Sequence, residues 1–268
     1  MVSRLILLLS RLLGYAVDRR TVVSGIALAA LPQAAVSALA NDASKASSED
    51  HVPFSRYAAQ RDGRRPSVLL LHGTRGFQLK LSAYERYANA LTSEGIDAYL
   101  VEFYTEIDSQ NLKGFNRKAD REAYDMQRYD AWTKRVSSAI TTILEGDYSS
   151  RQLGLLGFSL GGFVAAAAAS RDSRVTALGV LYGGMPDKIA PEVKRMPPTI
   201  EVHGDADSNV SLATGAALVT LARSVGAPAD QVTYYGKGHG FDFADNDPAT
   251  TDAVSRIAHF FKAQFDRV

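Results

Sequence analysis

Short apolar runs alternate with amphipathic stretches along most of this chain. The strand-like runs lie at 68–71, 98–103, 153–157, 178–182, 199–202 and 232–235. Helical periodicity is found at about 82–94, 121–145, 160–170, 212–225 and 248–265. This alternation predicts βα units around a mostly parallel, doubly wound sheet with helices on both faces.

Two segments between these elements are less regular. We expect a first strand over 52–59 to pair with the run at 68–71 through a turn at Asp62-Gly63, as in a hairpin. The connection between Tyr104 and Asp120 is polar and exceeds the roughly two to six residues usual for a βα loop. We therefore expect this connection to border a functional site.

Residues 1–50 differ in composition from the rest of the chain. An arginine pair, Arg19-Arg20, precedes an apolar, alanine-rich segment that ends in Ala38-Leu39-Ala40. This order resembles a twin-arginine export signal, which predicts cleavage near Ala40 and a periplasmic protein. An N-terminal helical extension of a cytoplasmic protein is the alternative. Neither this segment nor the shorter apolar run Leu5–Leu9 before it approaches the ~20 residues of a spanning helix, so we expect no stable membrane span. Residues 51–268 are long enough for one domain with a sizeable core.

The stretch from Arg151 to Ser170 has the pattern of a strand, a sharp turn and a helix of small residues, with Ser159 at the turn. Gly157-Phe-Ser159-Leu-Gly161 fits Gly-x-Ser-x-Gly, the sequence of a nucleophile elbow. Its two glycines supply the room that a close approach of strand and helix needs. The N–H of Leu160 would then point at a developing oxyanion. The alternative is a tight glycine turn with a passive serine.

A serine nucleophile needs a base and an orienting carboxylate, in the chain order Ser, Asp or Glu, His. Among the five histidines, only His239 follows both the serine and an acid on a glycine-rich loop after a strand. Asp207, after the strand at 199–202, is the favoured acid, and Asp205 could instead cap that turn. Asp187 and Asp242 are further candidates.

The second oxyanion donor is expected in the loop after the strand at 68–71, which begins His72-Gly73-Thr74-Arg75. We expect the Thr74 N–H to be that donor. Arg75 is a tentative contact for a substrate carboxylate, although a loop arginine is usually only solvated. Trp132, on the helix at 121–145, is a tentative contact for an acyl or alcohol group, with core packing as the alternative.

These motifs resemble those of the α/β-hydrolase superfamily and, within it, the dienelactone hydrolase family. The resemblance covers the chain from about Val52 onward and rests on the elbow, on His203-Gly-Asp-Ala-Asp207 and on Tyr235-Gly-Lys-Gly-His239-Gly-Phe241. It implies an α/β-hydrolase fold and a catalytic triad of Ser159, Asp207 and His239. Dienelactone hydrolases usually carry a cysteine at the elbow and a glutamate in the early oxyanion loop. Here Ser159 and Gly73 stand at those places, which favours a serine esterase.

Charge and cysteine content narrow the classes of partner. The chain has 30 basic and 29 acidic side chains, and no basic stripe interleaved with aromatic residues, so nucleic-acid binding is not expected. It has no cysteine, no His-Glu-x-x-His sequence and no phosphate-binding glycine loop, so no metal or cofactor is expected.

The sequence thus predicts a cofactor-free serine hydrolase that cleaves a small-molecule carboxylic ester or lactone through an acyl-enzyme intermediate. Three alternatives remain open. They are a dienelactone hydrolase proper, a thioesterase or peptidase on the same scaffold, and a non-catalytic binding protein with a decayed hydrolase fold.

Overall fold

The computed structural model describes residues 52–267 of the chain. The described residues all belong to one compact unit. The export signal predicted within residues 1–50 lies outside the described residues and stays a prediction. In the described part of the chain, no helix is both long enough and apolar enough to cross a membrane.

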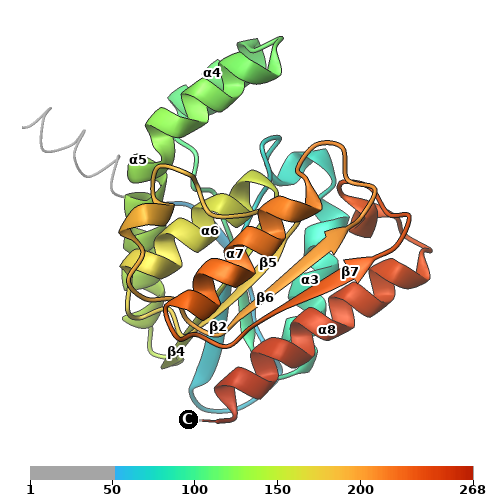
Figure 1. The fold of residues 1–268 in the computed structure, drawn as a ribbon. Coiled ribbons are helices and arrows are strands. Elements are labelled where there is room, and N and C mark those ends of the chain that lie inside the picture. The colour runs from blue at the N-terminus through green and yellow to red at the C-terminus, as the bar shows by residue number, and fades with distance from the viewer. Residues whose placement is uncertain (1–51, 268) are drawn as a thin grey trace, which may run out of the picture. The chain divides into compact units, whose positions relative to one another are not determined.

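A seven-stranded sheet forms the centre of the described unit (Figure 1). Its strands are β1 (Phe54–Tyr57), β2 (Arg65–Leu71), β3 (Asp97–Val101), β4 (Ser149–Phe158), β5 (Ala177–Leu181), β6 (Thr199–Gly204) and β7 (Ala229–Tyr234). They lie in the order β1-β3-β2-β4-β5-β6-β7, and every neighbouring pair except β1 and β3 is parallel. The chain runs from β2 to β3 on one side and then crosses to β4 on the other. The carboxyl ends of β2 and β4 therefore flank a topological switch point, where open α/β sheets bind ligands.

Helices cover both faces of this sheet. The α-helices of the described residues are α3 (Leu81–Ser93), α4 (Glu106–Gly114), α5 (Lys118–Leu144), α6 (Leu160–Arg171), α7 (Leu212–Ser224) and α8 (Pro248–Phe265), of which α4 stands away from the sheet. Short 3₁₀ helices lie at Phe77–Leu79, Ala190–Glu192 and Phe241–Phe243. The buried residues of α3 and α8 belong to one core, and those of α5, α6 and α7 belong to the other. The predicted doubly wound α/β fold is confirmed.

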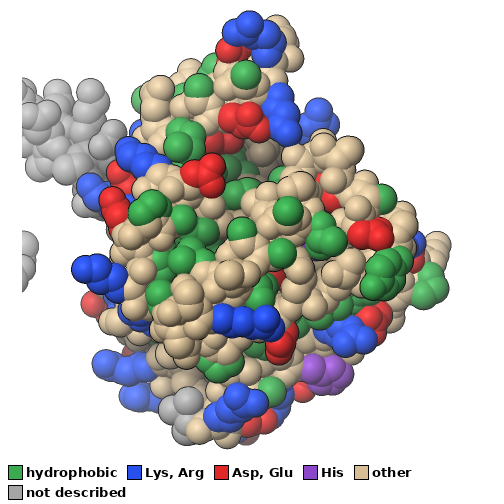
Figure 2. All heavy atoms as spheres, in the orientation of Figure 1, with side chains coloured by type: hydrophobic (Ala, Val, Ile, Leu, Met, Phe, Trp, Pro, Cys, Tyr) green, Lys and Arg blue, Asp and Glu red, His purple; other side chains and the backbone are tan. Residues whose placement is uncertain are grey.

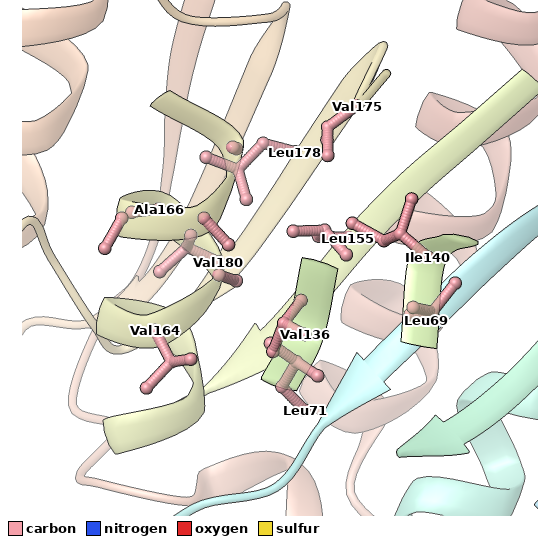
Figure 3. Packing of buried hydrophobic residues seen from close by; sticks show 14 of the residues in the cluster. Leu69, Leu71, Val136, Ile140, Leu155, Val164, Ala166, Val175, Leu178 and Val180 are labelled. Carbon is pink, nitrogen blue, oxygen red and sulfur yellow. The ribbon is translucent and has the colours of Figure 1, made fainter. Parts of the chain in front are cut away.

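Strand β2 shows how one segment serves both cores. Val68 and Leu70 pack in the core under α3 and α8, while Leu69 and Leu71 pack in the opposite core, beside Val136 of α5 (Figure 3). Successive side chains of a strand point to opposite faces, and here helices cover both. The run is therefore continuously apolar, without the alternation of a strand that has one face in water.

The predicted hairpin between 52–59 and 68–71 is wrong. Strand β1 pairs antiparallel with β3 at the edge of the sheet, with Phe54 opposite Val101. Strand β2 has no edge left for it, because β3 and β4 occupy both sides. The buried carboxylate of Asp97 on β3 links all three strands, since it accepts hydrogen bonds from Arg56 at 2.7 Å and from Arg65 at 2.8 Å.

The segment between Tyr104 and Asp120 is also more ordered than a polar loop, because it contains α4. Thr105 caps this helix in a reciprocal capping box with Asp108, a Thr-x-x-Asp signal that was present in the sequence. Asp108 is fully buried and accepts hydrogen bonds at 2.7 Å from both Tyr124 and Arg128 of α5. Burial alone would raise the pKa of Asp108, but these bonds outweigh it and lower the pKa. They hold α4 to α5 where it stands away from the sheet, at the top of Figure 1.

Charged side chains on the molecular surface are mixed in sign. Figure 2 shows basic and acidic groups interspersed over the face that it displays, with apolar side chains between them. This distribution agrees with the near balance of 30 basic and 29 acidic residues in the whole chain.

Candidate active site

Ser159 lies at the sharp turn between β4 and α6. Its backbone has φ 53° and ψ −120°, a conformation that is unfavourable for a residue with a side chain and persists only where the surroundings impose it. A Cβ on Gly157 would lie 2.2 Å from the Gly161 carbonyl oxygen, and one on Gly161 would lie 2.2 Å from the Leu71 carbonyl oxygen. The glycines therefore permit the approach of β4, α6 and β2 that holds the serine in place.

The Ser159 hydroxyl begins a hydrogen-bonded chain of three side chains. Its Oγ lies 2.9 Å from His239 Nε2, and His239 Nδ1 lies 2.7 Å from Asp207 Oδ2. The three residues follow β4, β7 and β6, whose carboxyl ends meet at one edge of the sheet. The Asp207 side chain is fully buried, whereas 20% of the His239 side chain is exposed. The imidazole is thus anchored on one side and open to solvent on the other.

Asp207 is the acid bonded to the imidazole, and Asp205 has a different role. The second oxygen of Asp207, Oδ1, accepts from the backbone N–H of Asn209 at 2.8 Å and of Val210 at 3.0 Å. Asp205 Oδ1 accepts from the Gly236 N–H at 2.6 Å and so joins the acid turn to the loop that carries the histidine. The other two candidates lie apart from this chain: Asp187 is exposed, and Asp242 is fully buried.

The remaining described histidines have surroundings that do not suit a base at Ser159. His72 is fully buried and stacks on Phe103 with ring centroids 4.3 Å apart, and burial lowers its pKa to about 4. His259 is exposed on α8. His203 is the penultimate residue of β6 and is fully buried, with its Nε2 3.4 Å from Asp207 Oδ2.

The loop after β2 lies directly against the elbow, as predicted. A Cβ on Gly73 would be 3.5 Å from the Ser159 Cβ. The Gly73 N–H donates to the Tyr84 hydroxyl at 3.2 Å, and the Thr74 carbonyl accepts from the Tyr104 hydroxyl at 3.3 Å. The N–H of Leu160, at the first position of α6, has no acceptor within its helix. Sequence reasoning missed both tyrosines, since nothing local links them to this loop.

The two tentative substrate contacts have unequal positions. Arg75 is exposed on the loop, and among the described residues no carboxylate pairs with it. Trp132 is fully buried and packs against four aromatic rings, those of Phe103, Tyr104, Tyr124 and Tyr129. Its position is that of a core residue, and the structure leaves it no exposed surface to offer a substrate.

Two buried tyrosines, Tyr182 and Tyr87, contact the loop that carries His239 and the short helix after it. The ring of Tyr182 lies against that of His239, with centroids 4.6 Å apart. Asp242, three residues after the histidine, accepts from the Tyr87 hydroxyl of α3 at 2.9 Å. Burial raises the pKa of Asp242 to about 6 against the opposing effect of the hydrogen bond from Tyr87. These contacts secure the short helix Phe241–Phe243 to α3 and so position the loop before it.

Within residues 52–267, no three or more His, Cys, Asp or Glu side chains are grouped so that they could hold a metal ion.

Residues 54–265 match the dienelactone hydrolase family. No curated protein matches the chain. Among solved structures, dienelactone hydrolase from Anabaena variabilis has a TM-score of 0.61 at 18% identity, covering 80% of this chain and 92% of its own. Est1E from Butyrivibrio proteoclasticus, with ferulic acid bound, has a TM-score of 0.61 at 15% identity, covering 80% and 96%.

A third similar structure is a dienelactone hydrolase-like promiscuous phosphotriesterase from metagenomic libraries. Its TM-score is 0.63 at 16% identity, covering 80% of this chain and 92% of its own. At such identities the likeness concerns the fold, while the family match spans nearly all of the described residues. This chain therefore belongs to the dienelactone hydrolase family and is a hydrolase acting on ester bonds, with an α/β-hydrolase fold.

Proposed function

We propose that this protein is a serine hydrolase that cleaves a carboxylic ester or lactone, with Ser159, His239 and Asp207 as its catalytic triad. The observation that carries the proposal is the unbroken hydrogen-bonded chain from Ser159 Oγ through His239 to the buried Asp207. A hydroxyl bonded to an imidazole that a carboxylate orients is the arrangement that acyl transfer through a serine requires.

The first half of the reaction forms the acyl-enzyme. Asp207 accepts from His239 Nδ1–H, which leaves the lone pair of the ring on Nε2, facing the Ser159 hydroxyl. His239 Nε2 takes the hydroxyl proton as Oγ attacks the carbonyl carbon, and Asp207 stabilises the resulting imidazolium. The N–H groups of Leu160 and Thr74 donate to the oxyanion, and losing one such donor typically costs ~10²–10³ in rate. His239 then protonates the leaving oxygen, and the alcohol departs.

The second half releases the acid. Water enters from the solvent-exposed side of His239 and gives a proton to Nε2 as its oxygen attacks the acyl carbon. The tetrahedral intermediate collapses, the proton returns to Ser159 Oγ and the carboxylic acid leaves. With a lactone as substrate, the alcohol and acid belong to one molecule, so a hydroxy acid is released only after this second step.

The residues at the nucleophile support an ester or a simple lactone over dienelactone. Ser159 occupies the place of the usual cysteine, and Gly73, which lies against it, has no carboxylate to interact with a resting thiol. The fold relative Est1E has ferulic acid bound, so we include aromatic esters among the substrates to screen.

Covalent labelling tests this function without assuming a substrate. The full-length protein is treated with a fluorophosphonate and its intact mass measured, beside Ser159→Ala, His239→Ala and Ser208→Ala. Ser208 is an exposed serine of the acid turn and serves as the matched control. We expect one adduct on the wild type and on Ser208→Ala, mapping to Ser159, and none on the other two variants. A folded wild-type protein that takes no adduct would instead favour a binding protein with a decayed site.

Substrate profiling then separates the remaining alternatives. The assay compares kcat/KM for esters, simple lactones, an unsaturated dienelactone, thioesters and peptides. The Ser159→Ala protein serves as the blank. We expect esters or simple lactones to be cleaved fastest. A preference for thioesters, peptides or dienelactone would keep the triad and replace the substrate class.

A further inference from the structure

A second row of buried polar side chains lies behind Asp207. Glu201 and His203 occupy alternate positions of β6, so both leave the strand on the same face, and both are fully buried. His203 Nδ1 lies 2.6 Å from Glu201 Oε1, and Gln231 of β7 donates to Glu201 Oε2 at 2.8 Å. The carboxylate also lies against Gly215 of α7, where a Cβ would come within 2.4 Å of it. The pair is thus held from a neighbouring strand and from a helix.

Val210 connects this pair to the acid of the site. Its carbonyl oxygen lies 3.0 Å from His203 Nε2, and its N–H donates to Asp207 Oδ1 at 3.0 Å. His203 Nε2 also lies 3.4 Å from Asp207 Oδ2, the oxygen that faces His239 Nδ1. The His203 ring therefore contacts both the turn that binds the Asp207 carboxylate and the carboxylate itself.

The partners of the His203 ring decide where its protons are. A carbonyl oxygen can only accept, so His203 Nε2 carries a hydrogen and donates it to Val210. One further proton lies between His203 Nδ1 and Glu201 Oε1, which makes the pair neutral as a whole. Burial alone would lower the pKa of His203, but the hydrogen bond and charge of Glu201 outweigh it and raise the pKa. The pair keeps its proton and donates its outer N–H to the carbonyl of Val210, the residue whose own N–H binds Asp207.

The charges around His203 are few. Those that act on it are Glu201, on its own strand, and Asp207, in the following turn. From the other elements packed on the pair, β7 contributes the neutral Gln231 and α7 contributes Gly215. A buried carboxylate such as Asp207 is unfavourable unless hydrogen-bond donors surround it, and His203 supplies one of the polar groups at its buried side.

We propose that Glu201 and His203 are positioning residues of this site, which hold the 205–210 turn through the Val210 carbonyl and keep the ionised Asp207 directed at His239. This inference rests on the proposed triad and extends it by a second layer. Neither residue contacts Ser159 or the place where a substrate would react, so both act through Asp207.

Two substitutions of His203 separate its two hydrogen bonds. In His203→Gln the amide nitrogen stands near the place of Nε2 and keeps the donor to Val210, while in His203→Asn it stands near that of Nδ1 and keeps the donor to Glu201. We expect His203→Asn to lose ~10–100-fold in kcat with little change in KM, by analogy with the loss of a hydrogen-bond partner that orients a metal-binding side chain. His203→Gln should stay within about threefold of the wild type, because it retains the contact that matters for Asp207.

We expect the stability of the two variants to depend on the hydrogen bond between residue 203 and Glu201. His203→Gln leaves Glu201 with fewer partners and should unfold more easily than His203→Asn. If His203→Gln folds poorly, it is replaced by the double variant Glu201→Gln/His203→Gln. The second substitution removes the unpaired carboxylate and keeps a side chain of the same size beside Gly215. Activity and stability should thus rank the two His203 variants in opposite orders.

Three measurements decide the inference: kcat and KM over a range of pH, the rate of fluorophosphonate labelling, and the downfield proton signal of the His239 N–H bonded to Asp207. For His203→Asn we expect slower labelling, a weakened downfield signal and an acid limb of the pH profile displaced to lower pH. Equal kcat, labelling rate and pH profile in the two His203 variants would overturn the positioning role and leave a purely structural pair. Absence of labelling in the wild type would instead refute the proposed triad, so the two failures are distinguishable.

Discussion

The sharpest test of the proposed triad is Asp207→Asn, because the structure dictates how the new amide must sit. Asp207 Oδ1 accepts from the backbone N–H of Asn209 and of Val210. The amide oxygen has to take that place, since an amide NH₂ there would face two donors. The NH₂ group is then left facing His239 Nδ1, which the wild-type Oδ2 approaches to 2.7 Å.

This orientation reverses the hydrogen bonds of the base. An NH₂ donor requires a lone pair on His239 Nδ1, so the proton of the neutral ring moves to Nε2. That nitrogen lies 2.9 Å from Ser159 Oγ and would donate to the hydroxyl where it should accept its proton. The wrong tautomer in a Ser-His-Asp triad lowers kcat by about 10⁴-fold, or about 5.5 kcal/mol in activation free energy.

Asp205→Asn is the matched control, since it makes the same chemical change two residues away. Asp205 bonds the Gly236 N–H and not the imidazole, so we expect its kcat to stay within about tenfold of the wild type. Initial rates on a chromogenic acetate ester give kcat for each protein, and circular dichroism checks that each is folded. A folded Asp207→Asn protein that keeps more than about a tenth of wild-type kcat, or an equal loss of activity in both variants, would refute the role of Asp207 in orienting the imidazole.

Three further outcomes test the structure around the site. Gly161→Ala should give little soluble protein, because its Cβ would lie 2.2 Å from the Leu71 carbonyl oxygen, whereas Gly114→Ala, with no atom within 4 Å, should match the wild type in soluble yield and Tm. Trp132→Ala should lower the free energy of unfolding by about 3–5 kcal/mol in urea titrations, and a loss under about 1 kcal/mol would contradict its core position. Because the folded pKa of Asp108 is depressed, its ionised form stabilises the fold above the unfolded pKa of about 3.9, and that contribution is lost as the pH falls through the folded pKa. The Tm difference between wild type and Asp108→Asn should accordingly shrink on acidification, and a difference independent of pH would count against the hydrogen bonds assigned to this carboxylate.

The sequence by itself determined the βα order and the elements that carry the site. Helices expected at about 160–170, 212–225 and 248–265 are found at Leu160–Arg171, Leu212–Ser224 and Pro248–Phe265. Such elements can be predicted because their apolar periodicity and their glycine turns are local properties of the chain. The serine, acid and histidine could be named for a related reason. Each lies within five residues of the end of a strand, and the carboxyl ends of parallel strands meet at one edge of the sheet.

Only the tertiary structure decided which groups meet when no local signal links them. It placed β1 beside β3, because β2 already had two neighbours, and it bonded Asp207 to the imidazole while Asp205 bonds the next loop. It also brought Tyr84 and Tyr104 to the loop beside the serine, and Glu201 and His203 behind the acid. Hydrogen bonds between residues far apart in the chain depend on how the layers pack, and a turn's own residues do not encode which of two acids will face a histidine thirty-two positions away.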